Sequence, residues 1–209
     1  MKPSKNCIDL VKYFEGLGDG DTKTPGLQPY MDPVGIWTIG YGKVLTQGGR
    51  RLVGPRDGPI AREIYPNGIT EEQAEAMLVE ELNSIAEKLK ANNVFGTQGQ
   101  IDAFVCMAYN IGLGQATGLR PTGFMGSTLL KMHRNGGVVS DYLDRHLLIK
   151  FAAASRNKQI TSIGTAFTAW SYSGKKWFLG LFRRRAAEYA LYRGHTAEQA
   201  INWVKDFRP

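Results

Sequence analysis

Cysteine, histidine and long apolar runs are all scarce in this 209-residue sequence, and each scarcity excludes a class of protein. Only Cys7 and Cys106 are present, which excludes a disulfide-rich secreted scaffold, and we expect two buried free thiols in a reducing compartment. The three histidines lie far apart, and no pair or cluster has metal-ligand spacing. We therefore expect no metal and no other cofactor.

Membrane-spanning and signal segments are also missing. No apolar run approaches the roughly 18–20 residues that a bilayer span requires. Asp9 and Lys12 interrupt the apolar residues near the N-terminus, so no signal-peptide core is present. The expectation is a protein that stays in the compartment that made it.

Charge is unevenly distributed along a chain of ordinary globular composition, with 43% hydrophobic and 22% charged residues. Residues 1–144 carry 14 Lys and Arg against 16 Asp and Glu, whereas residues 145–209 carry 12 against 3. The basic C-terminal portion predicts an anionic partner, which could be a nucleic acid, a membrane surface or an anionic cell wall.

The N-terminal third combines a helix with a β-hairpin. A short apolar stripe ends at Glu15, and Gly16 is placed to terminate that helix. Asp32-Pro33-Val34-Gly35 has the proline and glycine positions of a type I turn, and a β-branched and aromatic run follows, which predicts a hairpin over residues 28–42. Residues 46–68 are rich in glycine and proline and predict an irregular surface loop.

The rest of the chain has helical patterning. Thr70 and Gln73 form a capping-box pattern before an apolar stripe of helical spacing. Further helices are expected over residues 127–134, 141–154, 164–172 and 180–193 and after Thr196. The fold class predicted is α+β, mainly α, as one domain over residues 1–209. Its β-containing lobe would cover residues 14–69 and its helical lobe residues 70–209.

Glu15, Asp32 and Thr38 suit the hydrolysis of a glycosidic bond. That reaction needs one protonated carboxyl group to donate to the leaving oxygen and one ionised carboxylate. A helix C-terminus disfavours a carboxylate, so Glu15 would be the acid, and Asp32, in a polar turn, would stay ionised. The hydroxyl of Thr38 could hold a water together with Asp32. Each residue type is common at such places, and only the combination is informative.

The same residues carry a resemblance to a known family. Phe14-Glu15-Gly16-Leu17 followed by residues 29–42, PYMDPVGIWTIGYG, resembles the catalytic signature of the phage-type lysozymes of T-even and lambdoid phages. Five residues separate Asp32 from Thr38, as in that family. Residues 108–112, 126–130, 170–174 and 180–188 resemble further family segments in the same order.

The resemblance implies a lysozyme-like fold with an interlobe cleft and an endolysin that cleaves the β-1,4 bond between N-acetylmuramic acid and N-acetylglucosamine in peptidoglycan. It implies substrate contacts from Val44, Tyr109 and Ser127. It also implies a monomer that lyses the host with the help of a holin-type membrane partner. The basic C-terminal portion would contact the anionic envelope.

Three features depart from the family pattern. Sixteen residues separate Glu15 from Asp32, about eight more than is common, so residues 18–26 resemble an insertion. Lengthening a surface loop is entropically cheap, so the geometry can survive it. Lys43 stands where many relatives have histidine, and further insertions are expected at residues 46–68 and 145–162.

A water held by Asp32 and Thr38 on the sugar face opposite Glu15 predicts an inverting hydrolase.

Three other functions remain open at this point. A lytic transglycosylase would use the sugar's own hydroxyl in place of water. A non-catalytic peptidoglycan-binding module could stack sugars on Trp37, Tyr41 and Tyr109, and the basic C-terminal portion could bind nucleic acid.

Overall fold

A computed structural model describes residues 2–117, 121–140 and 142–209 and divides the chain into two compact units. Unit 2 comprises residues 11–81, and unit 1 comprises residues 1–10 and 82–209. Each unit is described by itself below. In the described part of the chain, no helix combines the length and the apolar character needed to cross a bilayer.

Unit 2 holds the β structure. A three-stranded antiparallel sheet has the order β1-β2-β3, and β4 and β5 form a separate hairpin. The elements of this unit are the end of α1 (Lys5–Glu15), β1 (Tyr30–Met31), β2 (Trp37–Ile39), β3 (Lys43–Val44), β4 (Thr46–Gln47), β5 (Arg50–Arg51), the 3-10 helix η1 (Pro55–Asp57), α2 (Gly58–Ile64) and the start of α3 (Glu71–Ala91). The predicted hairpin over residues 28–42 is confirmed, and β3 extends it by a third strand.

Residues 46–68 are not the irregular loop that their composition predicts. They fold into β4, β5, η1 and α2, and they bury Leu52 and Ala61 completely. The backbone of Trp37 donates to Leu52 O at 3.0 Å, and its indole donates to Gly54 O at 2.8 Å. The prediction was wrong because Gly48 and Gly49 form the tight turn between β4 and β5, while Pro55 and Pro59 occupy the first turns of η1 and α2, where proline is well tolerated.

Asp57, the last residue of η1, connects η1 to the β4–β5 hairpin within residues 46–68. Its carboxylate accepts two hydrogen bonds from the Arg50 guanidinium, at 2.7 and 3.0 Å, and a third from the Val53 amide at 2.7 Å. The hydrogen bond from Arg50 is the main reason that the pKa of Asp57 falls to about 2. The ionised carboxylate therefore helps to hold together a segment whose sequence has no long helix or strand.

This pairing predicts an acid-sensitive contribution to stability. An unfolded aspartate has a pKa of about 3.9, so the lower folded value stabilises the fold above pH 4. That contribution is lost as the pH falls from about 4 towards 2. We expect Asp57→Asn to lower the unfolding temperature at pH 6 and the gap from wild type to close towards pH 2. Circular dichroism melts across this range measure it, and a gap that stays constant with pH would contradict it.

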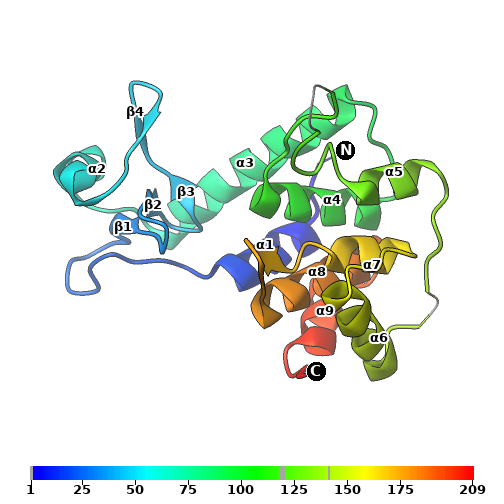
Figure 1. Cartoon of the computed structure of the whole chain (residues 1–209). Helices are drawn as coiled ribbons and strands as arrows, with labels where there is room; N and C mark the ends of the chain where they lie inside the picture. The colour runs from blue at the N-terminus through cyan, green and yellow to red at the C-terminus, as the bar shows by residue number, and fades with distance from the viewer. Residues whose placement is uncertain (1, 118–120, 141) are drawn as a thin grey trace. The chain divides into compact units, whose positions relative to one another are not determined.

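Unit 1 is built around α8 (Leu179–Tyr192), which packs against α4 (Gln98–Ile111), α7 (Ile163–Thr168) and α9 (Ala197–Val204). Figure 1 shows α8 beside α7 and α9 in this unit. The start of α1, the end of α3, α5 (Thr128–Arg134), α6 (Arg145–Arg156) and the small hairpin of β6 (Tyr172–Ser173) and β7 (Lys176–Trp177) complete it. From Phe182 to Tyr192, α8 is buried on nearly every side, so it forms the centre of this core.

The predicted helices agree with the structure except at two places. The helix expected over residues 164–172 ends at Thr168, because the chain turns into β6. The helix expected from residue 141 begins at Arg145 with Asp144 as its N-cap, and residue 141 itself lies outside the described residues. The capping boxes predicted at Thr70 and Thr196 are both confirmed.

The two cysteines are free and buried, as expected. Cys7 on α1 and Cys106 on α4 place their sulfur atoms 3.4 Å apart in unit 1. Burial raises the pKa of the Cys106 thiol well above its ordinary value, so the reactive thiolate is disfavoured. Nearby, the buried Asp102 accepts from the Ser4 amide at 2.9 Å and from Gln98 at 2.8 Å, which holds the N-terminal segment against α4.

Candidate active site

Glu15 is the last residue of α1, as its position before Gly16 predicted. Gly16 has φ of 69° and its amide donates to Lys12 O at 3.0 Å, which is the left-handed termination that glycine allows. The Glu15 side chain is half-buried and belongs to unit 2. Because α1 ends at a fixed residue, the backbone position from which the Glu15 carboxyl group extends is also fixed.

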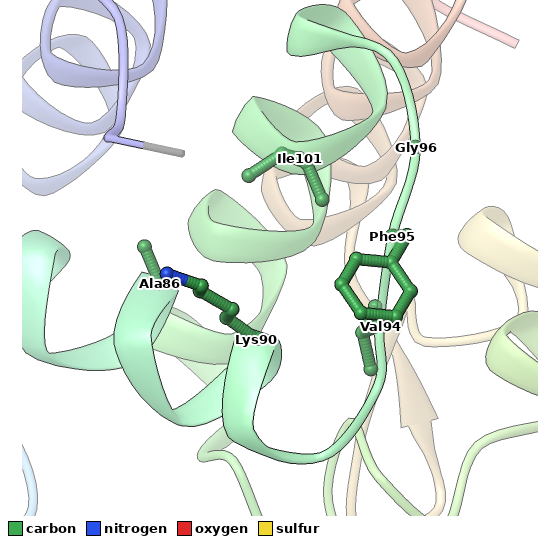
Figure 2. Close-up of a pocket in the computed structure, with 6 residues that line it drawn as sticks. All are labelled: Ala86, Lys90, Val94, Phe95, Gly96 and Ile101. Carbon is green, nitrogen blue, oxygen red and sulfur yellow. The ribbon is translucent and has the colours of Figure 1, made fainter.

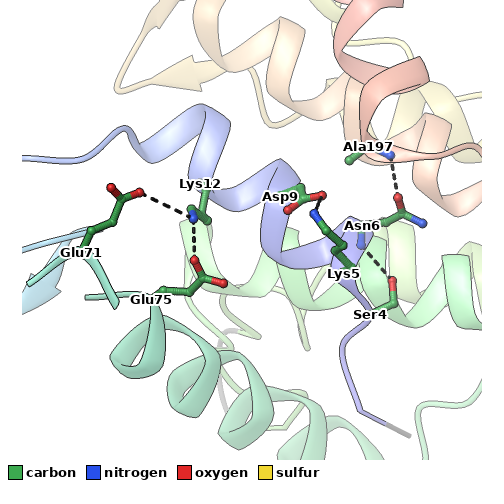
Figure 3. A network of polar contacts seen from close by, with 8 residues as sticks. All are labelled: Ser4, Lys5, Asn6, Asp9, Lys12, Glu71, Glu75 and Ala197. Carbon is green, nitrogen blue, oxygen red and sulfur yellow. Dashed lines mark hydrogen bonds and ion pairs between the residues drawn. The ribbon is translucent and has the colours of Figure 1, made fainter. Parts of the chain in front are cut away.

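Lys12, one turn before Glu15, fixes the end of α1 to α3 within unit 2 (Figure 3). Its ammonium lies 2.6 Å from a Glu75 oxygen, 3.9 Å from a Glu71 oxygen and 5.3 Å from the centre of the Tyr41 ring. The hydrogen bond to Glu75 raises the pKa of Lys12 above its ordinary value, so the ion pair is maintained across the neutral range. Lys12 is thus placed to act as a positioning residue for Glu15, whose role in catalysis stays a prediction.

The loop after Glu15 returns directly to the sheet. The Gly18 amide donates to Gly40 O at 3.1 Å, just after β2 ends. A β-carbon at Gly18 would come within 2.2 Å of the Tyr30 ring, so this close approach requires glycine. The contact joins the chain three residues after Glu15 to the chain two residues after Thr38.

Asp32 organises the turn between β1 and β2. Gly35 N donates to Asp32 O at 3.0 Å, which confirms the predicted four-residue turn. The side-chain atom Oδ1 of Asp32 accepts from the amides of Val34, at 3.0 Å, and Ile36, at 2.8 Å. Both hydrogen bonds go to one carboxylate oxygen, so the second oxygen, Oδ2, is oriented by them and can accept from a water.

Thr38 occupies the middle of β2 and is 3% exposed. The register pairs Thr38 with Tyr30 on one side and with Val44 on the other, so these three side chains share one face of the sheet. Asp32 follows Tyr30 by two residues, in the turn that joins β1 to β2. The Thr38 hydroxyl donates to Tyr30 O at 3.3 Å, which leaves its oxygen able to accept.

The predicted substrate contacts fall in both units. Val44 is half-buried in β3 of unit 2, beside Thr38. Tyr109, half-buried near the end of α4, and Ser127 belong to unit 1. Ser127 is 3% exposed and is the N-cap of α5, where its hydroxyl accepts from Leu130 N at 3.2 Å. Their contact with substrate stays a prediction.

Sequence reasoning missed the positioning residues Lys12 and Tyr30. The interval of three residues from Lys12 to Glu15 places them close on one helix face, which was the available signal for Lys12. The partners Glu75 and Tyr41 follow far along the chain, so no local pattern indicates them. Tyr30 could be recognised only from its contact with Gly18.

A cavity of about 220 Å³ lies elsewhere in unit 1, and none of the six predicted site residues lines it. Figure 2 shows the residues that do, which are Ala86, Lys90, Val94, Phe95, Gly96 and Ile101. The lining is mainly apolar and has no acid, so the cavity does not suit glycosidic chemistry. Among the described residues, no group of three or more His, Cys, Asp or Glu side chains could hold a metal ion.

These features define a lysozyme-like α+β protein, mainly α-helical. The muramidase domain of SpmX from Asticaccaulis excentricus matches at 25% identity and a TM-score of 0.55, over 91% of this chain and 97% of that one. The active form of the P1 phage endolysin Lyz matches at 15% identity and a TM-score of 0.55, over 93% and 86%. At that identity the second likeness shows the fold alone.

The chain belongs to the phage lysozyme family, whose model matches residues 23–148. The match includes Asp32 and Thr38, but it begins after Glu15 and ends before most of the basic C-terminal portion. The endolysins of Bacillus phage PZA and Bacillus phage B103 are 32% and 29% identical over 94% and 92% of this chain. The chain spans 57% and 54% of the lengths of these relatives.

Proposed function

We propose that this protein is an endolysin that hydrolyses the β-1,4 bond between N-acetylmuramic acid and N-acetylglucosamine in bacterial peptidoglycan. Membership of the phage lysozyme family supports this proposal, as does the similarity to the two Bacillus phage endolysins. The observation that carries it is the Asp32 turn, whose carboxylate is oriented by two backbone amides in the same hairpin whose second strand bears Thr38.

Glu15 would donate its proton to the leaving glycosidic oxygen. Asp32 and Thr38 would hold a water that attacks the sugar from the opposite face. Because the Thr38 hydroxyl donates to Tyr30 O, it meets that water as an acceptor. A water that donates one hydrogen to Thr38 and the other to Asp32 Oδ2 keeps a lone pair for the anomeric carbon, and Asp32 takes its proton as the bond forms.

This assignment predicts inversion of configuration. An inverting enzyme needs room for a water, so its two carboxyl groups stand about 6.5–9.5 Å apart, whereas retaining enzymes keep them near 5–5.5 Å. Proton NMR of the first-formed anomer from a soluble peptidoglycan fragment is the measurement. Retention of configuration, or a glycosyl adduct trapped on Asp32, would contradict the role given to Thr38.

Mass spectrometry of the digested wall separates hydrolysis from the alternatives. A hydrolase leaves reducing muramic ends, a lytic transglycosylase leaves 1,6-anhydro ends, and a binding module leaves the wall undigested. Because Asp32 and Thr38 can both accept from one water, we expect reducing ends.

Further parts of the proposal concern partners. Val44, Tyr109 and Ser127 would contact the sugar chain. The protein would act as a monomer, would be made in the host cytoplasm and would reach the wall through a holin-type membrane partner. The basic residues after 145 would bind the anionic envelope, which gives them a role distinct from catalysis.

A further inference from the structure

A basic hollow lies on unit 1 between the end of α6 and the β6–β7 hairpin. It is a cavity of about 350 Å³ lined by Lys158, Ile160, Ala169, Tyr172, Gly174 and Lys175. We propose that this β6–β7 hollow binds a chain of polyol phosphate diesters in the bacterial envelope. This inference rests on the proposed function, because a protein that hydrolyses the cell wall would meet such a polymer there. Binding and hydrolysis are measured in separate experiments.

The charge around the hollow is positive and has no nearby counter-charge in the sequence. From Arg156 to Lys176, the stretch that contains all the lining residues, the chain has four Lys and Arg and no Asp or Glu. Within the described part of the chain, the lysines at 158, 175 and 176 form no ion pair. Like charges gathered in one region repel one another, and a bound polyanion relieves that repulsion.

Three cations lie against aromatic rings: Lys158, which lines the hollow, and Arg156 and Lys176, which flank its lining residues in the sequence. Arg156 lies 4.5 Å from the Trp177 ring centre, Lys158 lies 5.8 Å from that of Tyr172 and Lys176 lies 5.4 Å from that of Phe178. A cation–π contact restricts a long side chain without neutralising its charge. These cations therefore lose less conformational entropy when they bind an anion than free surface lysines would.

The backbone at Lys158 is strained. It has φ of 54°, in the left-handed region that favours glycine and, to a lesser degree, asparagine, directly after α6 ends. Gly174, which also lines the hollow, takes a similar φ of 59° as glycine. Lys158 lines the hollow despite the strain of this backbone conformation, and its ammonium lies 5.8 Å from the centre of the Tyr172 ring, another part of the lining.

The geometry favours a phosphate diester chain over nucleic acid or a bilayer. Nucleic-acid bases need open aromatic faces on which to stack. Tyr172, the aromatic residue of the lining, already has the Lys158 ammonium over its ring, and the neighbouring Trp177 ring contacts Arg156 and Phe182. A bilayer surface is flat and does not enter a concavity. Lysine ammonium groups, which act as point charges, suit successive phosphates along a flexible chain.

The test measures the affinity of the full chain for labelled poly(glycerol phosphate) by fluorescence anisotropy. The variant combines Lys158→Gly, Lys175→Gln and Lys176→Gln. Its matched control combines Lys88→Gln, Lys131→Gln and Lys205→Gln, three exposed lysines of unit 1 that neither line the hollow nor adjoin its lining residues in the sequence and that carry the same charge. Loss of three surface charge contacts should raise Kd about tenfold in the variant and less than about twofold in the control.

Salt dependence gives a second readout, because the slope of log affinity against log salt should fall by about 2 in the variant. Lys158→Gly alone should weaken binding without lowering the unfolding temperature, since glycine fits that backbone. Equal weakening by the control, or equally tight binding of single-stranded DNA or phosphatidylglycerol vesicles, would overturn the proposal. The wild-type protein and the triple variant should hydrolyse walls stripped of phosphate polymer at the same rate. A wild-type protein that cannot hydrolyse these walls would contradict the proposed function and would leave the binding result unaffected.

Discussion

Glu15→Gln is expected to abolish lysis while leaving the protein folded. Glutamine has nearly the shape and helix propensity of glutamate, so α1 should keep its end. The amide cannot donate a labile proton to the leaving oxygen, so the rate should fall on the order of 100-fold or more. Initial rates on purified cell walls, with circular dichroism to confirm folding, measure the effect.

The matched control for this variant is Glu63→Gln, on an exposed turn of α2 in the same unit. It makes the same chemical change away from the end of α1 and should keep the wild-type rate. A folded Glu15→Gln protein that lyses walls at nearly the wild-type rate would remove Glu15 from the mechanism.

Asp32→Asn should produce a comparable loss by a different route. The amide oxygen of asparagine can still accept from Val34 and Ile36, so the turn should persist. In that orientation an amide NH₂ replaces Oδ2, and it donates where the attacking water needs an acceptor. Loss of the base should cost on the order of 100-fold or more in rate, read from the reducing ends released from purified walls.

Asp21→Asn is the control for this second variant. Asp21 also sits in a turn of unit 2, where it accepts from Lys23 N at 3.0 Å and from the Thr24 hydroxyl at 2.7 Å. Asp21 has no role in the proposed mechanism, so its replacement should leave activity unchanged. The variant therefore controls for the loss of a turn aspartate in general. If the two variants lose activity equally with intact folds, Asp32 has no special role and the water-holding arrangement is wrong.

The sequence alone determined the local framework of the candidate site. The end of α1 at Glu15, the four-residue turn at Asp32 and the strand through Thr38 all depend on residues close in the chain, namely a C-terminal glycine, a turn proline and a β-branched run. Short-range patterns of this kind predict elements well because a few adjacent residues set the backbone conformation. The roles given to these side chains stay predictions.

Long-range packing decided the rest, and composition could not indicate it. Residues 46–68 look irregular in sequence. In the structure, however, the Asp57 carboxylate accepts hydrogen bonds from Arg50 and Val53, and the segment buries Leu52 against the sheet. The contact between Gly18 and Gly40 likewise joins segments 22 positions apart, and the ion pair of Lys12 with Glu75 joins segments 63 apart. Such pairings depend on which surfaces meet after the chain folds, so only the tertiary structure could assign Lys12, Tyr30 and the β6–β7 hollow their places.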